Sequence, residues 1–131
     1  PWIGSRSSAC PQLPTTLPTL DELIGLDGIT AANVHERLLE HTAARPSHQV
    51  FTLHAELEGM KLLPVLQRLL QGWRAQGYAL VAMRSLLATL DVAALPAAPV
   101  ESGTVPGRSG TLAVQGAARI ASATLAIHGP G

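Results

Sequence analysis

The chain has 131 residues, 47% of them hydrophobic, which suits one small domain with a core or a piece of a larger one. Nine basic and nine acidic residues give zero formal net charge without a basic cluster, so attraction to nucleic acid is excluded. The single cysteine, Cys10, excludes an internal disulfide framework and a multi-cysteine metal site. No apolar run reaches the roughly 18 residues that a membrane-spanning helix requires. The chain starts at Pro1 rather than methionine, which suggests a processed or truncated product.

The sequence of the first quarter of the chain predicts a loop, then a short strand and then a short helix. Residues 1–11 show no periodicity and are expected to be irregular. Closely spaced prolines favour an extended segment around Leu13–Leu17. Thr19 and Glu22 have the spacing of a capping box, which predicts a helix of one to two turns that Gly25 ends.

The next segment predicts a longer helix, residues 31–44, capped by Thr30. It contains His35 and His41, a pair that superficially suggests a zinc site. Residues six apart on a helix point about 120° from each other, whereas the His-Glu-x-x-His zinc motif needs histidines four apart. We therefore expect an ordinary solvated helix face.

The most informative stretch runs from Val50 to Gly59. Val50–Leu53 is rich in β-branched and aromatic residues and predicts a strand, which His54, Glu56 and Glu58 follow directly. In α/β proteins the turn at the carboxyl end of a strand is where catalytic side chains gather. His54 is therefore the candidate catalytic residue. An alternative role, in which His54 caps the strand and bonds to a neighbouring carbonyl, fits the spacing equally well.

The second half begins with the clearest helix of the chain, from about Lys61 to Gln76. Its apolar stripe comprises Leu62, Leu66, Leu69, Leu70 and Trp73. Pro64 fits only in the first turn, where an amide would lack a partner anyway. A buried strand at Tyr78–Met83 and a short helix at residues 84–90 follow. From Asp91 the composition predicts an extended or mobile tail, with short strands at Thr111–Val114 and Ala123–Ile127 that have no clear partner.

This order of elements predicts an α/β fold with parallel strands. The connections are too long for hairpins, so right-handed crossovers are expected. Three parallel strands leave apolar faces and two edges uncovered, which indicates the second half of a (β/α) barrel. Residues 12–90 would form this partial barrel, residues 1–11 an irregular segment and residues 91–131 the tail. The alternative is a small free-standing three-layer domain.

Three stretches carry a resemblance to a known family. They are Gln12–Gly25, Phe51–Gly59 and the tail segment Val105–Gly110 with Leu112–Gly116. Over residues 10–116 the chain resembles the carboxyl-terminal half of deformylases that act on 4-deoxy-4-formamido-L-arabinose-phosphoundecaprenol, within the polysaccharide deacetylase superfamily.

The resemblance implies a distorted (β/α) barrel and a divalent metal. The metal ligands, one aspartate and two histidines, and the aspartate that acts as catalytic base would all come from the amino-terminal half, so none is expected in this chain. His54 matches the late-barrel Leu-His motif, whose histidine serves as general acid toward the leaving amine. Glu56 or Glu58 would orient this imidazole or bind a substrate hydroxyl, although capping of the next helix is preferred for Glu58.

The implied activity is metal-dependent deformylation of an undecaprenyl-phosphate-linked amino sugar in the aminoarabinose modification of lipid A. The chain alone is expected to be inactive without its partner, the amino-terminal half of the barrel, and the whole enzyme is expected at the bacterial inner membrane as a peripheral protein. One alternative is a non-enzymatic α/β module that binds a partner through an exposed sheet edge. Another is a barrel hydrolase with Glu56 as its base.

Overall fold

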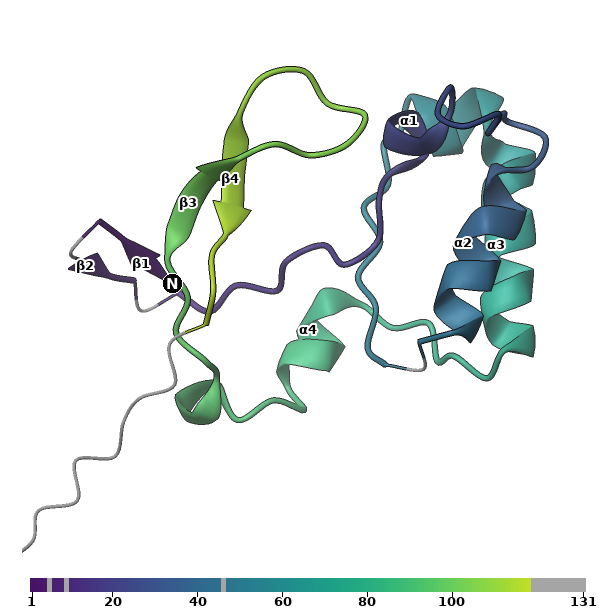
Figure 1. Cartoon of the computed structure of the whole chain (residues 1–131). Helices are drawn as coiled ribbons and strands as arrows, with labels where there is room; N and C mark the ends of the chain where they lie inside the picture. Colours follow the sequence, from purple (N-terminus) through teal and green to yellow (C-terminus); the bar gives the residue numbers. More distant parts are fainter. Residues whose placement is uncertain (5, 9, 46, 119–131) are drawn as a thin grey trace, which may run out of the picture.

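The computed structural model describes residues 1–4, 6–8, 10–45 and 47–118. The helices of this part are α1 (Leu20–Leu23), α2 (Val34–Ala43), α3 (Leu63–Ala75) and α4 (Met83–Leu87), with a π-helical turn η1 (Leu57–Lys61) and a 3₁₀ turn η2 (Val92–Ala94). The strands are β1 (Trp2–Ile3), β2 (Arg6–Ser7), β3 (Val100–Gly103) and β4 (Leu112–Gln115). Helices α1 to α3 form one end of the molecule and the strands lie at the other (Figure 1).

The core lies where α2 and α3 pack side by side, with α1 across one end (Figure 1). Its members are Leu17, Leu20, Val34, Leu38, Leu62, Val65, Leu69 and Trp73. The predicted apolar stripe of α3 is confirmed at Leu62, Leu69 and Trp73, but Val65 is buried while Leu70 is exposed. The buried face is therefore rotated slightly from the predicted one.

The helix boundaries largely follow their sequence signals. The Thr19 amide donates to Glu22 Oε2 at 2.9 Å, which is the predicted capping-box contact, and Gly25 ends the turn with φ of +101°. Pro64 lies in the first turn of α3, as predicted. Helix α2 begins at Val34 rather than Ala31, because the Asn33 side chain accepts a bond from the Thr30 amide at 2.7 Å and holds residues 31–33 in a turn.

The three predicted parallel strands are wrong for this structure. Leu13–Leu17, Val50–Leu53 and residues 78–82 carry no strand pairing, and Met83 already belongs to α4. A strand needs a neighbour to complete its backbone hydrogen bonds. Among the described residues, the main-chain bonds that join these segments to one another are those from the Thr16 and Leu17 amides to the Val50 carbonyl. The described part of the chain is thus a mixture of helices and small sheets, without a barrel.

The sheets that do form are antiparallel and lie in segments predicted to be irregular. In residues 1–8, β1 pairs with β2, and the Trp2 amide donates to the Ala98 carbonyl at 2.9 Å. In the predicted tail, β3 pairs with β4, with Val100 opposite Gln115 and Gly103 opposite Leu112. The strand predicted near Thr111–Val114 is therefore confirmed, with a partner the sequence did not reveal. The strand predicted at Ala123–Ile127 lies outside the described residues.

Among the described residues, none of the helices is both long enough and apolar enough to cross a bilayer.

Candidate functional site

His54 lies between the extended segment that follows Gln49 and the π-helical turn η1, and it faces α1. Its side chain is 28% exposed, and Nδ1 lies 3.3 Å from Asp21 Oδ1. The Nδ1 atom is shielded from solvent and has no well-directed hydrogen bond, so Asp21 acts on it through charge. Nε2 makes no hydrogen bond to a described residue and is accessible to solvent. The imidazole thus has one nitrogen beside a carboxylate and the other open to a ligand.

Glu58 holds the backbone at His54. Its side chain is only 1% exposed, and Oε2 accepts a hydrogen bond from the His54 amide at 2.7 Å. The His54 carbonyl in turn accepts from the Leu57 and Glu58 amides at 2.9 and 3.0 Å. Glu58 therefore fixes the backbone at His54 from within η1, where Glu56 is the N-cap residue, and it is buried rather than solvated. Its second oxygen, Oε1, is buried with no partner among the described residues.

Glu56 is placed differently from Glu58. It is exposed and makes no hydrogen bond or ion pair within the described part of the chain. The structure therefore brings Glu58 to the backbone of His54 and Asp21 to its ring, and it does not bring Glu56 to the imidazole.

Arg108 joins the carboxylates of α1 from the far end of the chain. Its Nε donates to Glu22 Oε1 at 2.8 Å, and its Nη1 lies 3.5 Å from Asp21 Oδ2. The preceding residue, Gly107, has φ of +82° and lies so close to α1 that a β-carbon there would overlap the Glu22 carbonyl group. Only glycine combines this φ with so close an approach, so Gly107 allows the turn to place Arg108.

The same contacts shift the pKa of both carboxylates. The Thr19 hydroxyl, above all, lowers the pKa of Asp21, helped by its backbone and by the positive charges of Arg108 and His54, against the opposing effect of burial. For Glu22, burial raises the pKa, but hydrogen bonds from Arg108 and from Thr19 outweigh it and lower the pKa overall. Both groups are therefore held in the ionised form beside the imidazole.

Sequence reasoning found His54 and missed the side chains around it. Asp21 and Glu22 were interpreted only as part of a helix cap, and Arg108 only as part of a turn. The available signal was that both segments lie in the stretches that carry the family resemblance.

The described residues do not fit a divalent metal. They contain no group of three or more histidine, cysteine, aspartate or glutamate side chains close enough to hold one ion. The pair His35 and His41 gains no third ligand.

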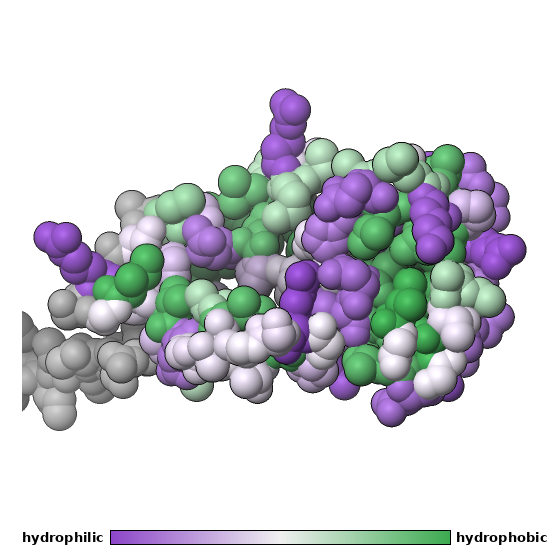
Figure 2. Space-filling view, turned by 90° about the horizontal axis from the view of Figure 1, so that it is seen from above, coloured by the Kyte–Doolittle hydropathy of each residue, from purple (hydrophilic) through white to green (hydrophobic). Residues whose placement is uncertain are grey.

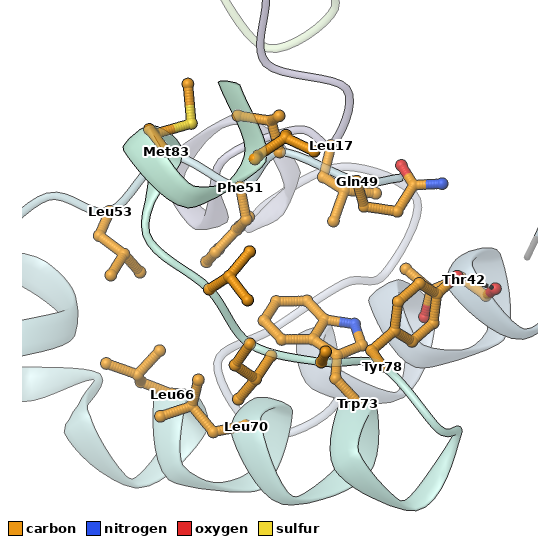
Figure 3. Close-up of a pocket in the computed structure, with 15 residues that line it drawn as sticks. Leu17, Thr42, Gln49, Phe51, Leu53, Leu66, Leu70, Trp73, Tyr78 and Met83 are labelled. Carbon is orange, nitrogen blue, oxygen red and sulfur yellow. Dashed lines mark hydrogen bonds between the residues drawn. The ribbon is translucent and has the colours of Figure 1, made fainter. Parts of the chain in front are cut away.

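An apolar groove of about 260 Å³ lies beside the site. It is lined by the extended segments Val50–Leu53 and Tyr78–Val81 and by Leu66, Leu70 and Trp73 of α3 (Figure 3). The Phe51 and Trp73 rings meet edge to face, with centroids 5.4 Å apart. The lining of the groove includes Leu53, the residue before His54, but not His54 itself.

Two curated bacterial proteins are similar to this chain in sequence. The one from Wigglesworthia glossinidia brevipalpis is 28% identical over 115 residues, which cover 88% of this chain and 40% of that protein. The one from Shewanella sediminis (strain HAW-EB3) is 32% identical over 106 residues, which cover 80% of this chain and 34% of that protein. Both are named probable 4-deoxy-4-formamido-L-arabinose-phosphoundecaprenol deformylase ArnD.

Other comparisons add no further relative. No protein-family model matches the chain, and no solved structure is significantly similar to it. The chain spans between about a third and two fifths of the length of the two curated relatives. The resemblance to the 4-deoxy-4-formamido-L-arabinose-phosphoundecaprenol deformylases is thereby confirmed over most of this chain, as a match to part of a longer protein.

Proposed function

We propose that this chain supplies the proton-donating part of a deformylase that hydrolyses the formamide of a lipid-linked amino sugar. The observation that carries the proposal is the imidazole of His54, held between the carboxylates of Asp21 and Glu58 with Nε2 open to solvent. The names of the two relatives indicate the substrate class.

The reaction requires a proton at a defined place. Water adds to the formyl carbon, the carbon–nitrogen bond breaks, and formate and the free amine are the products. The departing nitrogen must gain a proton, since an amide anion is a very poor leaving group. In the proposal, protonated His54 gives this proton from Nε2, on its solvent-facing side.

The neighbours of His54 have separate positioning roles. Asp21, with Oδ1 3.3 Å from Nδ1, orients the ring so that the other nitrogen faces outward. Glu58 fixes the main chain at His54, and Arg108 holds α1 through Asp21 and Glu22. The group that activates the water is not assigned among the described residues, and in the proposal it belongs to the part of the relatives that this chain does not match.

The proposed substrate places the complete enzyme at the inner membrane. A sugar carried on undecaprenyl phosphate stays in the bilayer, so we infer peripheral attachment of the complete protein. Glu56, as the base of a different hydrolase, is not favoured, because its exposed side chain has no hydrogen bond or ion pair with the described residues that would hold it in place.

The test is a chimera in which this chain replaces the matching stretch of the Shewanella sediminis protein. In that chimera His54→Gln should lower kcat by about 10²- to 10⁴-fold, the usual contribution of a general acid. His48→Gln, at an exposed histidine six residues earlier, is the matched control. Equal activity of the two variants in release of formate would contradict the proposal.

A further inference from the structure

Arg108 is placed beside the candidate site more strictly than its effect on stability explains. The loop between β3 and β4 reaches toward α1 (Figure 1), and only a glycine at position 107 allows its backbone to approach the Glu22 carbonyl group so closely. The guanidinium that follows is 37% exposed, and ion pairs with so exposed a partner contribute little to stability. The strict placement of Arg108 therefore calls for a second role.

The guanidinium keeps free donors on its exposed side. Its Nε donates to Glu22 Oε1 and its Nη1 contacts Asp21 Oδ2, while Nη2 bonds to no described residue. Asp21 is also 37% exposed, and its carboxylate has acceptor positions that the contacts with His54 and Arg108 leave unused. A hydrogen-bond donor and an acceptor, both open to a ligand, therefore lie side by side next to the imidazole.

The charges of this cluster favour a neutral polar ligand over an anion. The carboxylates of Asp21 and Glu22 face the guanidinium of Arg108, and Glu58 adds a further carboxylate at the backbone of His54. A phosphate group would therefore meet no net positive charge here. Seen from above, on the side of the molecule that carries α1 and this loop, hydrophilic residues interrupt the hydrophobic ones (Figure 2).

The sugar of the proposed function carries neutral polar groups in a matching order. In the named substrate the formamide is on C4 and the phosphate joins the anomeric carbon C1, so hydroxyl groups remain on the neighbouring carbons C2 and C3. The C4 nitrogen, the 3-hydroxyl and the 2-hydroxyl thus follow one another along one edge of the ring. His54, Asp21 and Arg108 also follow one another, with 3.3 Å between Nδ1 and Oδ1 and 3.5 Å between Oδ2 and Nη1.

We propose that Asp21 and Arg108 select the sugar by its neighbouring hydroxyl groups, Asp21 accepting from the 3-hydroxyl and Arg108 donating to the 2-hydroxyl. The proposal rests on the proposed role of His54, because the C4 nitrogen at Nε2 fixes which edge of the ring faces the cluster. A hydroxyl group both donates and accepts, so it can bind to this pair without separating the two charges. The contacts would hold the C4 nitrogen against the imidazole while the carbon–nitrogen bond breaks.

Kinetics of the Shewanella chimera on deoxy analogues test this assignment. The analogues are the same lipid-linked formamido sugar without its 2-hydroxyl or without its 3-hydroxyl. Loss of the 2-hydroxyl should lower kcat/KM by about 10- to 100-fold, the effect of one hydrogen bond to a charged group. Arg108→Gln should abolish this discrimination against the 2-deoxy sugar and keep the discrimination against the 3-deoxy sugar. Arg37→Gln, at an exposed arginine of α2, is the matched control and should change neither.

The ratio between substrates separates recognition of the sugar from folding of the turn. If Arg108 only anchors the turn, Arg108→Gln lowers kcat/KM for the complete and the 2-deoxy sugar by the same factor, which would overturn the proposal. An effect of Arg108→Gln that disappears when the phosphate is removed from the substrate would also overturn it, since Arg108 would then bind the phosphate. His54→Gln should lower kcat on all three sugars and keep their ratios of kcat/KM. An unaffected His54→Gln would contradict the proposed function, while the ratios would still decide the role of Arg108.

Discussion

Glu56 and Glu58 lie two positions apart, and their different burial gives them different effects on stability. Glu58→Ala leaves the His54 amide without its acceptor and creates space in a buried position, so it should lower the free energy of unfolding by about 1–3 kcal/mol. Glu56→Ala, at an exposed and unpaired position, should change it by less than about 0.5 kcal/mol. Urea denaturation followed by tryptophan fluorescence measures both. A similar effect of the two variants would show that the hydrogen bond of Glu58 is dispensable.

At the same scale, the sequence predicted one residue of the candidate site, His54, and not the side chains that surround it. His54 was recognisable because it directly follows a strand-like run. Its neighbour Asp21 lies across the fold and was explained fully by helix capping, so no local pattern indicated a second role. Burial of Glu58 was equally hidden, because two glutamates in a polar turn normally face water.

At the scale of the element, α3 provides a matched pair of leucines. Leu69 is fully buried between α2 and α3, whereas Leu70 is partly exposed on the groove side. Leu69→Ala should cost about 2–5 kcal/mol of unfolding free energy, as in other well-packed cores. Leu70→Ala should cost clearly less, because its site is open to solvent. Urea denaturation measures the loss of unfolding free energy in both variants. A larger loss for Leu70→Ala than for Leu69→Ala would mean that the groove is filled in solution.

The long helices were predictable here, whereas of the strands only the one near Thr111–Val114 was, for a physical reason. A helix satisfies its backbone within one segment, so the 3.6-residue period of α3 and the cap at Thr19 were sufficient evidence. A strand is completed only by a partner. Val50–Leu53 has the right composition and stays unpaired, while Val100–Gly103, poor in strand-favouring residues, pairs with β4.

At the scale of the whole molecule, the contact of Arg108 with α1 should weaken as the pH falls. The pKa of Asp21 and that of Glu22 are both lowered by folding, so their stabilising effect is complete above their ordinary values of 3.8 and 4.5 and is lost as pH falls through the lowered ones. Limited proteolysis at the Val105–Gly110 turn should therefore accelerate below about pH 4.

The Arg108→Gln variant tests whether the contact of Arg108 with Asp21 and Glu22 is what protects the turn from cleavage. It should show fast cleavage of the turn already at neutral pH with little change in global stability, since Arg108 is partly exposed. Arg37→Gln, which removes an exposed helix pair with Glu40, is the control and should leave cleavage unchanged. A turn cleaved at the same rate in all three proteins across pH would contradict this account.

The ion pair between Arg108 and Glu22 joins residues 86 positions apart, whereas α2 and α3 meet through a much shorter loop. Closing a long loop costs more chain entropy than closing a short one. The contact that offsets this cost can form only after both of its partners are in place. The helical pair should thus form early in folding and the Arg108 contact late. Substitutions at Leu69 should then slow refolding, whereas substitutions at Arg108 should mainly speed unfolding. The candidate site would in this way be the last part of the described chain to assemble and the first to open.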